Sequence, residues 1–187
     1  MVERYMLHLG NDGYSRTDAP SILRRARALT GRPVTVRDVR VASAHIELDV
    51  TIPDGALPGT LEALEPLGGT VDTRLINEAE IPKEDAIREG IAYFNGERFW
   101  ECHESFEGVW KGCYEGEKDL VQGIILAAAG LVHYQKNEDA ICLSIFGRAL
   151  KKLARCAGTY HTIDVELLRR RLAGMIRSGR ISTFELA

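Results

Sequence analysis

The residues best suited to chemistry lie in one short stretch, which runs from Phe94 to Trp110. Its seventeen positions hold four carboxylates, one histidine and five aromatic side chains. Aromatic side chains favour burial, whereas carboxylates resist it, so the mixture is typical of a polar site at the edge of a core. A histidine among carboxylates can bind a divalent metal or transfer protons.

Helical spacing would bring the histidine of this stretch close to two of its carboxylates. Successive residues of an α-helix rotate by about 100° around its axis. One stripe of the helix then consists of Phe99, His103, Phe106 and Trp110. Trp100, Glu104 and Glu107 follow along the edge of this stripe, and Glu101 points the opposite way, towards solvent or a surface ion pair. We therefore expect an imidazole and two carboxylates at the rim of an aromatic surface.

A metal site is the first interpretation of this rim. His103 and Glu107 stand at i and i+4 on one face, and Glu104 is next to them, a ligand set that suits Zn, Mn or Mg. Glu104 and Glu107 are also the catalytic candidates, since a spare carboxylate could activate water. His133 is the further ligand candidate, although antiparallel packing would put it about 9 Å beyond the level of His103. Gln122 is about 16 Å from His133 along its helix, so the two cannot bind one ion without distortion.

A structural interpretation stays open beside the metal site. In it, the His103 imidazole is a buried group bonded to a carboxylate, and the aromatic side chains are core residues. The candidates for lining a ligand pocket are Trp100, Trp110 and Gln122. A strip of small residues, Gly123, Ala127 and Gly130, favours close packing of the aromatic face against the next helix.

The run Phe-Trp-Glu-Cys-His-Glu-Ser-Phe-Glu-Gly-Val-Trp at residues 99–110 is followed by Gln122-Gly123-Ile124-Ile125-Leu126-Ala127-Ala128-Ala129 and by His133. This combination resembles the family known as domain of unknown function 309, an all-helical domain of bacteria and archaea. The resemblance covers roughly Ala86 to Leu153. Members are often labelled predicted metal-dependent hydrolases, so the resemblance implies a hydrolase as the first hypothesis.

The first eighty residues predict strands and helices in the order βαββαβ. The expected elements are a strand at 4–9, a helix from Asp18 to Gly31, strands at 34–43 and 45–52, a helix at 57–67 and a strand at 70–76. In the expected strand at 45–52, one face is formed by Ile46, Leu48, Val50 and Ile52. This order is the split βαβ, or ferredoxin-like, arrangement.

From Ile81 onward the period of the apolar residues is helical, and strand signals are absent. We expect five helices, at 82–95, 97–111, 119–135, 137–153 and 164–178, the fourth capped by Asn137. Short connections favour an antiparallel bundle. The predicted class is thus α+β, with a ferredoxin-like domain at 1–80, a helical bundle at 81–187 and a boundary near Asn77 to Pro82.

The composition is that of a globular protein, with 45% apolar and 27% charged residues. Its net charge of −3 offers no general attraction to nucleic acid or to anionic membranes. No CxxC pair, signal peptide or apolar run of spanning length is present, which favours a reduced, cytoplasmic protein without a membrane partner. We expect a homo-oligomer and a small-molecule ligand or substrate that the sequence does not identify.

Three functions follow from these patterns. The first is the metal-dependent hydrolase, and the second is a non-catalytic module that binds a small ligand or another subunit. The third is a binder of an anionic partner through a basic helix face, formed by Arg148, Lys151, Lys152 and Arg155 with Arg169-Arg170-Arg171 nearby. A solvated surface is the simpler interpretation of these charges, because no phosphate-binding loop accompanies them.

Overall fold

The structure is a computed structural model that describes residues 1–77 and 81–186. It divides into two compact units, one N-terminal and one C-terminal, with Gln135–Asn137 grouped with the first. The predicted boundary near Asn77 to Pro82 falls on residues 78–80, which lie outside the described residues. Among the described residues, no helix has the length and apolar character that a bilayer crossing requires.

The N-terminal unit follows the predicted βαββαβ order. Its elements are β1 (Val2–Gly10), α1 (Ala19–Thr30), β2 (Thr35–Val41), β3 (His45–Pro53), α2 (Leu57–Leu64) and β4 (Thr70–Leu75), with short 3-10 turns at Arg16–Asp18 and Glu65–Leu67. The strands form one antiparallel sheet in the order β2-β3-β1-β4. This order is that of the split βαβ, so the ferredoxin-like prediction is confirmed.

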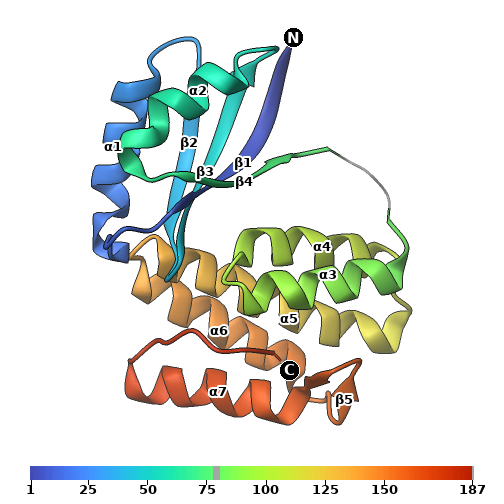
Figure 1. The fold of residues 1–187 in the computed structure, drawn as a ribbon. Helices are drawn as coiled ribbons and strands as arrows, with labels where there is room; N and C mark the ends of the chain where they lie inside the picture. The colour runs from blue at the N-terminus through green and yellow to red at the C-terminus, as the bar shows by residue number, and fades with distance from the viewer. Residues whose placement is uncertain (78–80, 187) are drawn as a thin grey trace. The chain divides into compact units, whose positions relative to one another are not determined.

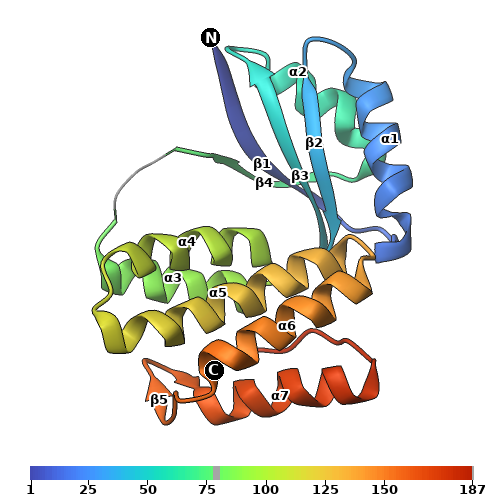
Figure 2. The ribbon, with the colours of Figure 1, turned by 180° about the vertical axis from the view of Figure 1, so that it is seen from behind.

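The core of this unit lies between the sheet and its two helices. Helices α1 and α2 lie on the same side of the sheet in both views (Figures 1 and 2). Alternate side chains of the central strands point into this core, among them Leu7, Leu9, Ile46, Leu48, Val50 and Ile52. The side chains between them therefore point to the opposite face of the sheet, where His8 and Glu47 lie.

The C-terminal unit is helical, as predicted. Its helices are α3 (Lys83–Asn95), α4 (Phe99–Lys111), α5 (Glu115–Gln135), α6 (Asp139–Leu153) and α7 (Val165–Ser178). Two-residue strands, β5 (Thr159–Tyr160) and β6 (Ile163–Asp164), form a small hairpin before α7. The sequence did not predict this hairpin, because two residues are too few to show a strand period.

Glycines let the helices of this unit approach closely. A Cβ atom on Gly90 of α3 would lie 2.7 Å from the Phe106 ring of α4. On α5, a Cβ on Gly123 would lie 2.5 Å from Leu153, and one on Gly130 would lie 2.5 Å from Phe146. The small-residue strip of α5 therefore packs against α6, and the expectation that it receives the aromatic face of α4 is wrong.

Three helix starts differ from the predictions by two or more residues. Helix α5 begins at Glu115 rather than at residue 119. Helix α4 begins at Phe99 rather than at Glu97, because Glu97 has a φ of 58° in the left-handed region and Arg98 is the N-cap. Helix α6 has Glu138 as its N-cap, while the predicted cap, Asn137, has a φ of 63°. Helix α7 begins after its Asp164 cap and ends at Gly179, as predicted.

Candidate functional site

The face of α4 that enters the core is rotated from the predicted one. Its buried apolar side chains are Phe99, Cys102, Phe106 and Val109. The predicted stripe is correct for the two phenylalanines, but His103 and Trp110 lie at its rim, each partly exposed. Small side chains such as Cys102 suit close contact between helices, whereas a polar ring nitrogen is better satisfied at the edge of a core. Cys102 is fully buried in the core, and this burial raises the pKa of its thiol.

His103 lies between two carboxylates, as the sequence indicated. Its Nδ1 is 3.2 Å from Oε1 of Glu104, and its Nε2 is 3.8 Å from Oε1 of Glu107. The two ring nitrogens thus face different carboxylates from opposite edges of the imidazole, which is 29% exposed. In this conformation the three side chains form a chain of contacts and do not converge on one point.

Glu101 was expected to face solvent or a surface ion pair. The ion pair is present, but the exposed position is wrong. Its side chain is buried and forms a two-point ion pair with Arg98, whose Nε and Nη2 each donate to one carboxylate oxygen. The Arg98 guanidinium also stacks on the Tyr93 ring, 5.0 Å from its centroid. Two hydrogen bonds from arginine compensate for the desolvation of a buried carboxylate, and the sequence pattern could not show this pairing.

Of the remaining predicted residues, His133 and Trp110 contact other side chains. The His133 Nδ1 is 2.5 Å from Oε2 of Glu138, near the junction of α5 and α6. Trp110 packs at the edge of the core under the ammonium group of Lys118, 5.3 Å from its ring centroid. Trp100 and Gln122 are partly exposed. Their roles as metal ligand or pocket wall stay predictions.

The basic helix face is exposed at Arg148, Lys151, Lys152 and Arg155, and Lys152 donates a 2.8 Å hydrogen bond to Asp119. The anionic partner of this face also stays a prediction.

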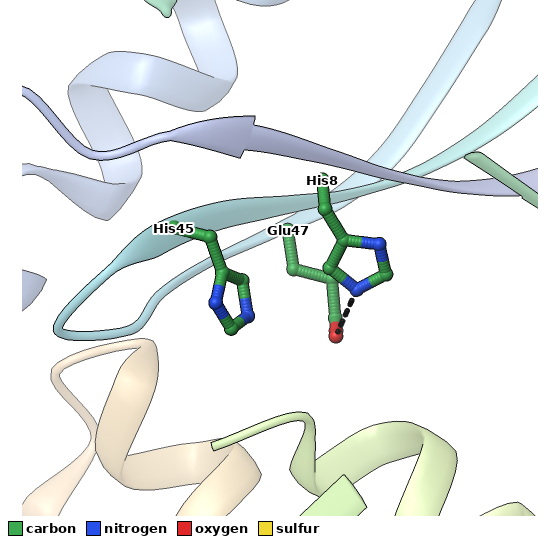
Figure 3. Close-up of side chains that lie close together, drawn as sticks. All are labelled: His8, His45 and Glu47. Carbon is green, nitrogen blue, oxygen red and sulfur yellow. Dashed lines mark hydrogen bonds and ion pairs between the residues drawn. The ribbon is translucent and has the colours of Figure 1, made fainter. Parts of the chain in front are cut away.

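A second His and Glu cluster lies on the sheet of the N-terminal unit. His8 of β1 and His45 and Glu47 of β3 extend to the same side of the sheet (Figure 3). One ligand atom from each of the three side chains lies within 4.8 Å of the other two. Within residues 1–77 and 81–186, these three side chains form the group whose ligand atoms lie close enough together to bind one ion.

The register of the sheet brings the three side chains together. His8 pairs with Glu47 across β1 and β3, and His45 pairs with Gly10 two positions along. Paired residues of an antiparallel ladder point to the same face, so the side chains of His8 and Glu47 meet. The His8 Nε2 is 3.3 Å from Oε2 of Glu47, and the two imidazole rings are 5.2 Å apart with an edge-on orientation.

Arg40 of β2 completes the polar face of the sheet. It lies opposite Glu47 in the register, and its Nη1 donates to Oε1 of Glu47. Its Nη2 is 3.6 Å from a carboxylate oxygen of Asp38. On β1, Arg4 forms a two-point ion pair with Asp49, at 2.9 and 2.7 Å. The two oxygens of Glu47 therefore have different neighbours, Arg40 on one side and His8 on the other.

This cluster was missed in the sequence, although part of its signal was visible. The alternation that puts Ile46 and Leu48 in the core also puts His45 and Glu47 on the opposite face, and His8 lies between two core leucines. The pairing of His8 with Glu47 depends on strands about forty residues apart, so no local pattern indicates it.

The comparisons with known proteins concern the helical unit. A family model matches the segment from residue 87 to residue 145, which contains all of α4 and α5. That family is Domain of unknown function (DUF309). The predicted resemblance of the C-terminal half is confirmed. The DUF309 segment contains His103, Glu104, Glu107 and His133, but not the cluster on the sheet. A search of curated proteins finds no match to this chain.

Proposed function

We propose that this protein is a metal-dependent hydrolase whose ion is held by His8, His45 and Glu47. The observation that carries the proposal is the convergence of two imidazole nitrogens and one carboxylate oxygen within 4.8 Å. Two histidines and one glutamate are a known ligand set of zinc hydrolases. Three protein ligands also leave a coordination position for water or substrate.

One pair of ligand atoms lies at the spacing that a small divalent ion requires. Ligand distances of about 2.0–2.2 Å put the ligand atoms of one ion about 3–3.5 Å apart, and the His8 Nε2 is 3.3 Å from Glu47 Oε2. Two imidazoles favour Zn or Mn over Mg, which prefers oxygen ligands and retains its waters. A bound ion would polarise a substrate oxygen and lower the pKa of its water.

The protein's own residues would orient this site. Arg40 donates to Oε1 of Glu47, which directs Oε2 towards His8. When a hydrogen-bond donor fixes one oxygen of a ligating carboxylate, the side chain loses less conformational entropy as its other oxygen binds an ion. Arg40 is thus a positioning residue for Glu47.

The metal content of the untagged protein tests this proposal. We expect about one Zn or Mn per chain after removal of all metal with EDTA and reloading, together with hydrolysis of a p-nitrophenyl ester or phosphate that depends on the ion. Replacement of a ligand, in His8→Ala, His45→Ala or Glu47→Gln, should abolish both. His161→Ala is the matched control, because His161 lies outside the cluster, and it should retain both.

His103→Ala separates the sheet site from the helical one. If the ion is held on the sheet, this variant keeps its full metal content. Loss of the metal in His103→Ala with retention in His45→Ala would place the site in the DUF309 segment and contradict the proposal. A wild type that takes up no metal would also contradict it.

The second candidate function is a non-catalytic module that uses its His and Glu residues as a structural network. The contact of His103 Nδ1 with Glu104 favours it, because this hydrogen bond gives the imidazole a partner other than an ion. In that case His103→Ala lowers the melting temperature equally with and without EDTA, and no metal-dependent hydrolysis is detected.

A further inference from the structure

A cavity of about 280 Å³ lies between α3 and the turn that joins β5 to β6. It is lined by Glu84, Ile87, Arg88, Ile91, His161 and Thr162. The volume is at the lower end of the range of ligand pockets, which suits a molecule of about ten non-hydrogen atoms. The cavity belongs entirely to the C-terminal unit and shares no residue with the His8 cluster.

One stripe of α3 supplies the floor and one rim of this cavity. The residues stand at i, i+3, i+4 and i+7, so they share one helix face. Ile87 is buried and Ile91 packs against the core, which makes the floor apolar. Glu84 and Arg88 carry opposite charges one helical turn apart.

Glu84 and Arg88 contact other side chains and not each other. The Arg88 guanidinium pairs with Asp85 on the exposed side of α3. The Glu84 carboxylate is 3.4 Å from Nδ1 of His161 on the opposite wall. Glu84 and Arg88 are 72% and 75% exposed, so both charged groups are accessible from solvent. An acid and a base thus flank an apolar floor.

The opposite wall is held in place before any ligand arrives. Ile163 is fully buried beneath the turn, and the Tyr160 ring packs edge-on against His161, with ring centroids 4.7 Å apart. The backbone amide of Gly158 donates to the carboxylate of Glu166, at 2.9 and 3.1 Å. A rigid wall reduces the entropy that a small ligand must overcome on binding.

We propose that this cavity binds a free aliphatic α-amino acid. The ligand ammonium contacts Glu84, its carboxylate contacts Arg88 and His161, and its side chain covers Ile87 and Ile91. A zwitterion satisfies both charges at once, whereas a simple amine or acid satisfies one. The site is independent of the metal-dependent function proposed above.

Titration of the full-length protein with L-leucine tests this inference, with NMR chemical shifts as the readout. Because the charged groups are exposed, we expect a Kd on the order of 1 mM. Isopentylamine and 4-methylpentanoate, which keep the side chain but only one charge, should each bind at least about tenfold more weakly. Glu84→Gln and Arg88→Gln should each weaken L-leucine binding by about tenfold.

Two variants on the same helix serve as controls. Glu89→Gln makes the same change as Glu84→Gln at a position that does not line the cavity, and it should leave the Kd unchanged. Asp85→Asn removes the competing partner of Arg88 and should not weaken binding. The inference is overturned if no saturable shifts appear at about ten times the expected Kd. It is also overturned if the amine or the acid alone binds as tightly as L-leucine, or if Glu84→Gln behaves like Glu89→Gln.

Discussion

The Tyr160 hydroxyl donates a 2.6 Å hydrogen bond to Oε1 of Glu117, a carboxylate that is almost completely buried. The other oxygen of Glu117 accepts a 2.6 Å hydrogen bond from Nζ of Lys83. Burial and the hydrogen bond to Glu117 raise the pKa of Tyr160, so its phenol stays protonated and acts as a donor. Glu117 thus joins the β5–β6 hairpin to the first turns of α3 and α5.

Removal of the Tyr160 hydroxyl should destabilise the C-terminal unit. Tyr160→Phe leaves a buried carboxylate oxygen without its donor, and we expect a loss of about 1–2 kcal/mol in the free energy of unfolding. Urea denaturation followed by circular dichroism measures this loss. Tyr114→Phe is the control, because Tyr114 is 73% exposed, and it should change stability by less than about 0.5 kcal/mol. Equal effects of the two variants would show that the hydroxyl of Tyr160 contributes nothing.

The stabilising effect of Glu117 should depend on pH. Burial opposes its ionisation, but the hydrogen bonds from Lys83 and Tyr160 outweigh burial and lower the pKa of Glu117 below its ordinary value of 4.5. Because the folded-state pKa is lowered, ionised Glu117 contributes fully to the free energy of unfolding above pH 4.5. This contribution is lost as the pH falls through the pKa of Glu117 in the folded state.

Glu117→Gln should therefore be less stable than the wild type by about 1–2 kcal/mol at pH 7. The difference should shrink progressively below pH 4.5. Denaturation curves of both proteins at several pH values between neutrality and strongly acid conditions measure it. A difference that is constant, or that grows towards acid pH, would contradict this assignment.

The close packing of α5 against α6 should make Gly130 intolerant of a side chain. A Cβ atom there would lie 2.5 Å from the Phe146 ring, so Gly130→Ala should cost about 1–3 kcal/mol. Gly147→Ala on α6 is the matched control, because no atom lies within 4 Å of its Cβ position. Since alanine favours helix over glycine, Gly147→Ala should gain up to about 1 kcal/mol. Thermal unfolding of the two variants would show opposite shifts, and a stabilised Gly130→Ala would refute this packing.

Zinc should stabilise the N-terminal unit if His8, His45 and Glu47 bind it. An ion that binds only the folded state at about one hundred times its Kd adds about 2.7 kcal/mol to the free energy of unfolding. Calorimetry with and without zinc measures the shift in the melting temperature. His45→Ala should lose this shift, while His161→Ala should retain it. A shift of equal size in His45→Ala would mean that the zinc binds elsewhere.

The two units should fold independently. Their apolar cores have no residue in common: one extends from Leu7 to Leu67 and the other from Ala86 to Leu186. A fragment of residues 81–186 should be soluble and helical by circular dichroism, with a cooperative thermal transition. A fragment of residues 1–77 should show a cooperative transition of its own. An unfolded or aggregated helical fragment would show that its core requires the N-terminal residues.

Local periodicity predicted most of the elements. In β3, the alternation of Ile46, Leu48 and Val50 indicates a strand with one buried face, and the same strand appears in the structure. Helix α7 was predicted to within one residue of its start, because Asp164 is a side-chain cap and Gly179 is a left-handed stop. Signals of this kind lie within a few residues of one another and need no knowledge of the fold.

The buried face of α4 differs from the predicted one, which shows the limit of such local signals. A repeat of apolar residues defines a stripe, but the exact face that enters the core depends on which neighbour packs there. The contact of Gly90 with Phe106 sets that face in the structure and leaves His103 and Trp110 at the rim. Glu101 is buried because Arg98 pairs with it, so its charge was a misleading guide to exposure.

The sequence by itself determined the α+β class, the order of the elements other than the β5–β6 hairpin, the resemblance to DUF309 and the proximity of His103 to Glu104 and Glu107. Tertiary structure alone decided that His8 meets His45 and Glu47, since their strands pair across a long stretch of chain. It also decided that Tyr160 and Lys83 share one carboxylate of α5. Local patterns follow from the dihedral preferences and burial of neighbouring residues, whereas these clusters depend on the register and packing of distant segments.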